Sequence, residues 1–144
     1  MLVELIGEFT GKNVVYRVLP DGKVEISNQG MGKILGMDAF IMSTALATIA
    51  NGTFKGEVNS LITTMDGSAV MMKGNAVSWQ SEKGGVTRAA SIQTTQSEKL
   101  IRLNKVLAFM DMKLMRWGTG KARFGSGNIT QRSSFAWFCS HLQL

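Results

Sequence analysis

The sequence predicts an all-β protein: an antiparallel up-and-down β-barrel with one short helix near residues 97–103. Dipeptides typical of tight turns recur at short intervals along the 144 residues. The segments between them are rich in Val, Ile, Thr and Phe, and the whole chain has a single proline. These segments are about ten residues long and follow one another without long crossovers, which favours a closed barrel over a Greek-key sandwich.

Three hairpin turns are predicted from their residue types. In Pro20-Asp21-Gly22, proline sets the first corner and glycine is free to take a positive φ. Asn51-Gly52 and Asp66-Gly67 are dipeptides preferred in two-residue type I′ turns. The strand-like segments beside and beyond these turns are 14–19, 23–27, 40–50, 53–64, 68–79, 86–95 and 105–117.

The short helix is predicted from Ser97, a favourable N-cap, followed by Leu100 and Leu103 on one side of one or two turns. Isolated glycines inside the strand patterns, such as Gly56 and Gly74, fit a strongly coiled barrel. At the bends of such a barrel a Cβ atom would clash with the neighbouring strand.

Alternation predicts which side chains face the interior. In segment 105–117 the inward set is Val106, Ala108, Met110, Met112 and Leu114. Segment 40–49, in contrast, is apolar on both of its faces. An apolar outer face is explained if the carboxy-terminal segment or another subunit covers it, so we predict a homo-oligomer, either a dimer or a trimer.

The candidate site is inferred from methionines and from two central charges. Ten methionines are many for this length, and thioethers occur in pockets for variable apolar ligands, although they also serve as plain core filler. If Glu57 and Arg88 face inward, they must pair or be solvated, and they could then polarise a carbonyl or anchor a carboxylate. The alternative is an exposed cross-strand ion pair. The candidate ligand-binding residues are Met42, Glu57, Met72, Arg88, Met110 and Met112.

The counts of cysteine and histidine exclude several catalytic mechanisms. Cys139 and His141 are the single cysteine and the single histidine, and both lie in the last six positions. Ser-His-Asp, Cys-His and zinc-hydroxide chemistry are therefore excluded from the body of the chain, so we expect no metal site and assign no catalytic residue. Residues 30–36 have the spacing GxGxxxG with no helix after them, which fits a glycine-rich β-bend better than a dinucleotide site, and we expect no cofactor.

The sequence also predicts a cytoplasmic protein without a membrane span. No apolar run approaches the roughly 18 residues that a membrane-spanning helix needs. Glu4 and Glu8 stand where a signal peptide requires basic and apolar residues.

The net charge of +6 is unevenly distributed along the chain. Residues 1–70 contain five basic and seven acidic side chains, whereas residues 71–144 contain eleven and three. Residues 116–124 interleave three bases with two aromatic rings, a composition found in surfaces that bind single-stranded nucleic acid. We favour solvated edge charges and a loop at the barrel rim, because the chain has no block of like charges and no ribonucleoprotein motif.

The order of several motifs carries a family resemblance. These motifs are residues 18–27, 30–36, 56–57, 63–67 and 95–104. With them, residues 5–120 resemble a family of small uncharacterised proteins similar to the allene oxide cyclase and dirigent type of calycin-like β-barrel. The resemblance implies about eight antiparallel strands, frequent dimers or trimers, and a lumen that holds a lipophilic substrate and steers its cyclisation or coupling by shape. It assigns no catalytic residue to this chain.

We therefore predict a barrel domain over residues 1–128 and an apolar tail over residues 129–144 that packs on the barrel or on a partner subunit. The predicted function is the binding of a lipophilic small molecule in the lumen. Two alternatives stay open: an isomerase or cyclase that acts on an unsaturated, lipid-like substrate in the same lumen, and a basic barrel that binds single-stranded nucleic acid.

Overall fold

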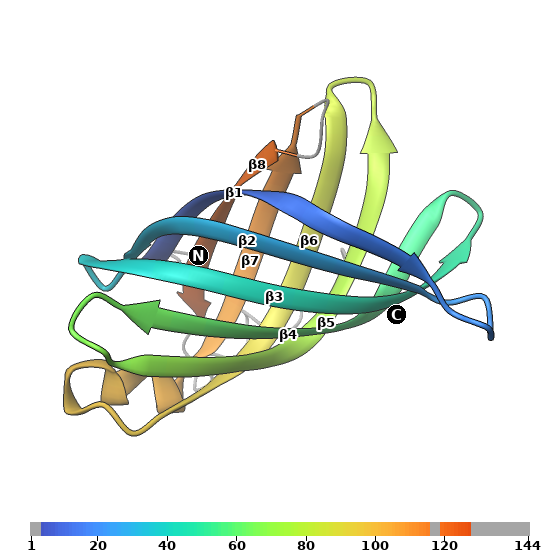
Figure 1. Cartoon of the computed structure of the whole chain (residues 1–144). Coiled ribbons are helices and arrows are strands. Elements are labelled where there is room, and N and C mark those ends of the chain that lie inside the picture. The colour runs from blue at the N-terminus through green and yellow to red at the C-terminus, as the bar shows by residue number, and fades with distance from the viewer. Residues whose placement is uncertain (1–3, 116–118, 128–144) are drawn as a thin grey trace.

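The computed structural model describes residues 4–115 and 119–127, which form a closed barrel of eight antiparallel strands. Each strand pairs with its neighbours in sequence, and β1 pairs with β8 to close the barrel (Figure 1). The predicted up-and-down barrel with one short helix is confirmed. The elements are β1 (Glu4–Val18), β2 (Val24–Ile34), β3 (Met37–Ala50), β4 (Thr53–Thr64), β5 (Ala69–Ser81), β6 (Gly84–Thr95), the 3₁₀ helix η1 (Glu98–Lys105), β7 (Leu107–Leu114) and β8 (Thr119–Gly127).

The three predicted turns connect strands, but one has a different geometry from the one expected. Asn51 and Gly52 both have a positive φ, 52° and 72°, as a type I′ turn requires. At Asp66-Gly67 only the glycine has a positive φ, and its N–H donates to the carbonyl oxygen of Thr64 at 3.0 Å. This hairpin is therefore not type I′: the geometry is that of a type I turn followed by a left-handed glycine.

A fourth hairpin, between β2 and β3, was not predicted as a turn at two residues: a glycine-rich β-bend was expected over residues 30–36, but residues 30–34 belong to β2. Leu35 and Gly36 form its turn, with φ values of 46° and 79°. A leucine in this conformation is disfavoured by roughly 1–2 kcal/mol, which is why the residue type gives no turn signal. Packing offsets this cost, because the Leu35 side chain lies against the buried core and its N–H donates to the carbonyl oxygen of Ile6 at 2.7 Å.

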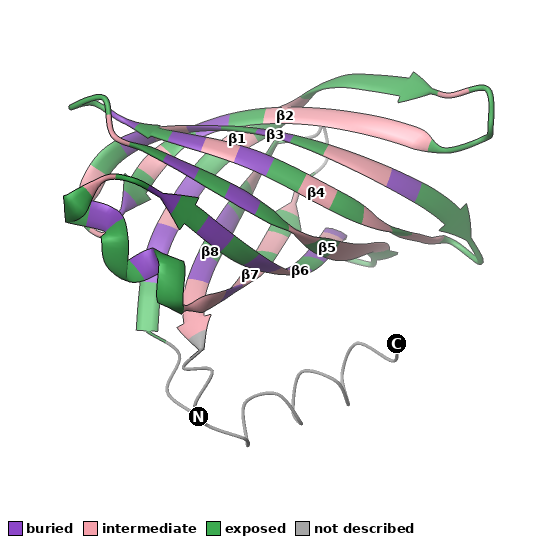
Figure 2. Cartoon of the chain, turned by 90° about the horizontal axis from the view of Figure 1, so that it is seen from below, coloured by how far each residue is buried: buried purple, intermediate pink, exposed green. Residues whose placement is uncertain are grey.

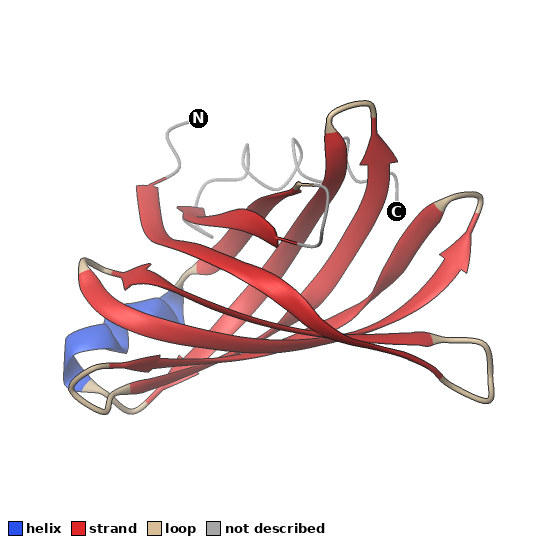
Figure 3. Cartoon of the chain, turned by 45° about the horizontal axis from the view of Figure 1, so that its top comes forward, coloured by secondary structure: helices blue, strands red, loops and turns tan. Residues whose placement is uncertain are grey.

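The helix η1 closes one end of the barrel, beside the β2–β3 and β4–β5 turns (Figure 3). A 3₁₀ helix has three residues per turn, so Leu100 and Leu103 share one face, and both side chains are fully buried in the core. Ser97 is the N-cap residue, as predicted, although its side chain makes no capping hydrogen bond.

Polar contacts hold η1 against two strands, β1 and β6. Arg102 forms a bidentate pair with Glu4 on β1, with N···O distances of 2.8 and 3.1 Å. The hydrogen bond and the charge of this guanidinium lower the pKa of the Glu4 carboxyl. Asn104 holds the end of β6, because its side chain accepts from the N–H of Thr95 and donates to the Thr95 carbonyl, at 2.8 and 2.9 Å.

The segment expected to be a rim loop is the closing strand β8. Its side chains alternate strictly: Ala122 and Phe124 point inward and are buried, whereas Lys121 and Arg123 point outward. The Phe124 ring packs edge-on against the Phe9 ring of β1, with centroids 5.8 Å apart. The glycines of this strand weaken its pattern in the sequence, which explains the wrong expectation.

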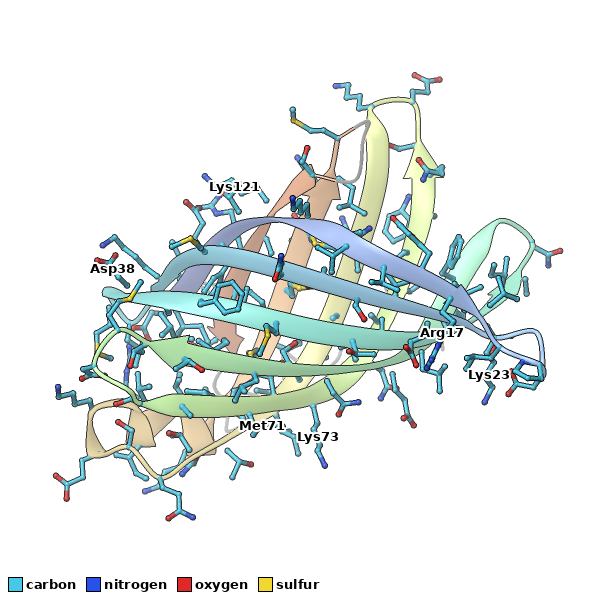
Figure 4. The ribbon with its side chains drawn as sticks, viewed as in Figure 1. Arg17, Lys23, Asp38, Met71, Lys73 and Lys121 are labelled. Carbon is cyan, nitrogen blue, oxygen red and sulfur yellow. The ribbon has the colours of Figure 1, made fainter. Side chains whose placement is uncertain are left out.

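The outer wall around this seam carries charges that alternate in sign across six strands. Cross-strand register aligns them in the order Arg88, Asp111, Arg123, Glu8, Lys33 and Asp38. Within this charge row, N···O distances are 3.8 Å for Arg88–Asp111, 3.2 Å for Arg123–Glu8 and 2.7 Å for Lys33–Asp38. Opposite charges directly across a strand pair stabilise the register in which they face each other. Asp38 stands at one end of this row, and Lys121 pairs with Glu8 in its middle. Both side chains project away from the barrel in Figure 4.

Glycine permits the close strand contacts that tight coiling requires. A Cβ atom on Gly56 would lie 1.9 Å from the carbonyl oxygen of Leu46, and one on Gly74 would lie 2.0 Å from that of Ala90. No side chain fits at these two positions without a backbone shift, in agreement with the prediction for glycines inside the strands.

Candidate functional site

A cavity of about 210 Å³ lies in the barrel and opens at the end opposite η1. Buried and exposed residues alternate along the strands, so one face of the sheet forms the lumen (Figure 2). The floor consists of core side chains, among them Phe9, Ile41, Met72 and Phe124. Tyr16 and Phe54 lie near the mouth, close to the β1–β2 and β3–β4 hairpins.

The wall is mainly apolar and almost free of charge. No Asp, Glu, His or Arg is found among the described residues that line the cavity, and only Lys12 and Tyr16 there carry a titratable group. Both belong to the half of β1 that leads to the mouth. The deeper part of the cavity therefore offers a ligand apolar contacts and neutral hydrogen-bonding groups.

Hydroxyl groups form two pairs in the cavity wall. Ser43 Oγ of β3 lies 2.7 Å from Ser60 Oγ of β4, and both residues are buried. Ser78 Oγ of β5 lies 2.7 Å from Thr87 Oγ1 of β6. In each pair one hydroxyl donates to the other, so the second O–H remains available to another acceptor. Asn28 adds a carboxamide to the wall between β1 and β3.

Three of the six predicted ligand-binding residues line the cavity. Met72 lies on its floor, and Met110 and Met112 of β7 line its wall. The predicted inward set of residues 106–114 is confirmed, since Ala108 is buried and Leu114 also lines the cavity.

The other three residues, Met42, Glu57 and Arg88, lie on the outer face, and the structure does not bring them into the cavity. Strand parity is the reason: each is separated by an odd number of positions from an inward-facing residue of its own strand. Arg88 lies 3.8 Å from Asp111, and its guanidinium stands 5.6 Å from the centre of the Trp79 ring. Glu57 is aligned with Asn75 rather than with a cation, so the expected Glu57–Arg88 pair does not form.

Sequence reasoning missed the polar part of the wall. Ser43, Ser60 and Asn28 carry no charge, and the residues two positions away on the same face are apolar or glycine, so they gave no signal for a site. The signal that could have found them is the turn at Asn51-Gly52, because a two-residue turn pairs residues that are equally far from it. Ser43 lies eight residues before Asn51, and Ser60 eight residues after Gly52.

The basic segment considered for nucleic-acid binding contributes little surface for base stacking in its described part. Phe124 points into the barrel, and Lys121 and Arg123 both pair with Glu8, at 2.8 and 3.2 Å. The Lys121 ammonium, through its hydrogen bond, lowers the pKa of the Glu8 carboxyl. Residues 116–118 lie outside the described residues.

Within the described ranges, no group of three His, Cys, Asp or Glu side chains could hold a metal ion, and no helix there is long and apolar enough to cross a membrane. Cys139, His141 and the predicted tail of residues 129–144 lie outside the part of the chain that the structure describes.

The outer face of β2 to β5 carries exposed apolar side chains. Met31 of β2 is aligned with Phe40 of β3, and Leu61 of β4 is aligned with Met42 on one side and with Met71 on the other. The exposed fractions of the three methionines are 60% for Met31, 47% for Met42 and 42% for Met71. Met71 points away from the barrel, as does Lys73 two residues on (Figure 4).

The sequence matches no protein-family model and no curated protein. Its fold is similar to that of solved proteins from three bacteria. A conserved protein of unknown function from Rhodopseudomonas palustris aligns with a TM-score of 0.72 and 11% identity, over 87% of this chain and 95% of that one. A protein of unknown function from Clostridium acetobutylicum aligns with a TM-score of 0.71 and 11% identity, over 89% of this chain and 100% of that one.

The third, a beta-barrel like protein from Acinetobacter baumannii, gives a TM-score of 0.72 and 13% identity, over 88% of this chain and 96% of that one. At these identities the likeness establishes the fold alone. The chain is a small β-barrel whose structural neighbours are uncharacterised, which agrees with the coarser part of the resemblance inferred from the sequence.

Proposed function

We propose that the barrel binds an uncharged, lipophilic small molecule in its lumen. The observation that carries this proposal is the cavity of about 210 Å³, which is lined mainly by apolar side chains and has no carboxylate, imidazole or guanidinium among its described lining residues. Its volume lies below the ~300–1,000 Å³ of most ligand pockets, so the ligand is small or extends through the mouth. A cavity with apolar walls and few polar groups gives affinity by burial and orientation by hydrogen bonds.

The experiment is a titration with Nile red, an uncharged apolar dye whose fluorescence rises on transfer from water. Ala76 lines the cavity from β5, whereas Ala69 of the same strand is exposed on the outside. We expect Ala76→Phe to weaken dye binding at least about tenfold by occupying the lumen, and Ala69→Phe to leave it unchanged.

The outer methionines provide the second control, because they could attract the dye by themselves. Met42→Gln/Met71→Gln removes apolar contact area from the outer face without changing the lumen. Loss of dye binding in this variant, together with unchanged binding in Ala76→Phe, would place the dye outside and contradict the proposal.

The isomerase or cyclase alternative, and the finer resemblance to allene oxide cyclase and dirigent proteins behind it, would use the same cavity. Such an enzyme would steer its substrate by shape, because Lys12 and Tyr16 are the only titratable groups among the described lining residues. No particular contact favours turnover over binding, so binding is the proposed function.

We further propose that the outer face of β2 to β5 joins copies of this chain as a dimer or trimer, in the cytoplasm as predicted. The support is the cluster of Met31, Phe40, Met42, Leu61 and Met71, which strand register places side by side. Light scattering of the full chain should give more than the monomer mass. Met42→Gln/Met71→Gln should lower it, and a concentration-independent monomer would contradict the assembly.

A further inference from the structure

A continuous row of polar side chains crosses the inner wall of the barrel. Strand register aligns Asn13 of β1 with Asn28 of β2, Asn28 with Ser43 of β3, and Ser43 with Ser60 of β4. All four residues line the cavity. We call these four residues the polar row. Because their strands are consecutive, the row follows the wall as one band that is a single residue wide.

The inward-facing positions on both sides of this band are apolar or glycine. Along β2, β3 and β4, the positions next to the row are, toward the closed end, Gly30, Ile41 and Ile62, and toward the mouth, Ile26, Ala45 and Val58. A ligand against this wall therefore meets neutral polar groups along one line and apolar surface above and below it.

The polar row offers hydrogen bonds that the protein itself leaves unused. Ser43 and Ser60 share one hydrogen bond at 2.7 Å, so one of their two O–H groups is left to donate and lone pairs are left to accept. The Asn28 carboxamide makes no side-chain hydrogen bond to the residues that the structure describes, so both its N–H₂ and its oxygen are available. Donor and acceptor capacity thus lie on adjacent strands, roughly 5 Å apart.

The same register line continues through Met72 and ends at Gln93, which is 5% exposed. The Gln93 amide donates to the carbonyl and hydroxyl oxygens of Ser91, at 2.9 and 3.0 Å. Its Oε1 has no hydrogen-bond partner among the described residues. A buried acceptor without a donor is costly. Gln93 does not itself line the cavity, so the polar row that a ligand meets ends at Ser60.

We propose that the polar row selects, among small apolar ligands, those that carry an uncharged hydroxyl or carboxamide group. This inference rests on the proposed function and specifies its ligand class. A hydroxyl or carboxamide both donates and accepts, so it can bond to Asn28 and to the Ser43–Ser60 pair at once. A plain hydrocarbon displaces water from these groups and returns no hydrogen bond. A carboxylate brings a charge that finds no cation in the row, because Lys12, the one lysine among the described lining residues, occupies the outward position between Gly11 and Asn13.

The test compares naphthalene, naphthol and naphthoate, which share one ring system and differ in a single group, by competition against Nile red at neutral pH. With the natural chain, naphthol should bind about tenfold more tightly than naphthalene and than naphthoate. In Asn28→Leu/Ser43→Ala/Ser60→Ala the preference for naphthol over naphthalene should disappear, while naphthalene binding persists.

The matched control is Ser27→Ala/Thr44→Val, which removes two hydroxyls from the outer face of β2 and β3, outside the cavity, and should keep the preference for naphthol. If the triple variant does not fold, Asn28→Leu alone gives the test, because it retains the buried serine pair. Equal binding of naphthol and naphthalene, or loss of the preference in the control variant, contradicts the role of the polar row while leaving the proposed function intact. Failure of every probe, Nile red included, contradicts both.

Discussion

Closure of the barrel by η1 makes a quantitative prediction about two leucines. Leu100 and Leu103 have no exposed surface and lie in the same core cluster as Ile6 and Phe124. Truncation of either to alanine removes buried methyl groups and leaves a cavity, so the free energy of unfolding should fall by about 2–5 kcal/mol. Because the two side chains share one face of η1 and one core cluster, their effects should couple, and the double variant should cost less than the sum of the single ones.

The control is in the same helix, since Ile101 is 50% exposed. Ile101→Ala should cost about 1 kcal/mol or less. Urea unfolding followed by tryptophan fluorescence measures all four variants, and an unchanged slope with a lower midpoint would show that stability alone has changed. Equal losses of unfolding free energy in Leu100→Ala and Ile101→Ala would refute this prediction, because the buried face of η1 would then add no stability to the core.

Two further predictions concern strand coiling and pH. Gly56→Ala places a Cβ against the carbonyl oxygen of Leu46 and should lower the free energy of unfolding by about 1–3 kcal/mol, whereas Thr63→Ala, on the outer face of the same strand, should change it little in the same urea assay. The pKa values of the Glu4 and Glu8 carboxyls are lowered from 4.5 in the folded chain, so their contribution to stability is complete above pH 4.5 and is lost as the pH falls through the lowered values. Urea midpoints measured down to about pH 2 should therefore fall, and should fall less steeply in Glu4→Gln; a parallel decline in the two proteins would contradict this.

The sequence predicted elements best where a turn has its usual residues. Asn51-Gly52 has the φ values that the dipeptide favours, and it fixes the register of β3 against β4. Leu35-Gly36 forms the same kind of two-residue turn, yet it could not be recognised, because a leucine is tolerated there only through its tertiary contacts with the core. The strand β8 was missed for a related reason: its glycines look like loop residues until a neighbouring strand supplies their partners.

The candidate site was half predicted, and strand parity explains the division. Met110 and Met112 lie in a segment whose alternation is clear, so their inward orientation followed from the sequence. Met42 lies in a strand that is apolar on both faces, where composition cannot tell inside from outside. Glu57 and Arg88 were considered because of their charge, but a charged side chain gains most from water, and the outer face provides it.

The polar row and the charge row show why a binding site in a barrel is hard to predict from the amino-acid sequence. Each row consists of residues that register brings together from several strands, and a single bulge displaces every later member of a strand to the other face. The irregularity of β1 between Asn13 and Val15 lies next to the first member of the polar row. The row therefore depends on the three turns that join β1 to β4 and on the position of this bulge. Methionines supply apolar contact wherever they face inward, but the direction in which a ligand lies must come from groups whose hydrogen bonds have a direction. Orientation in this lumen is therefore a property of strand register, and composition alone determines only how apolar the lumen is.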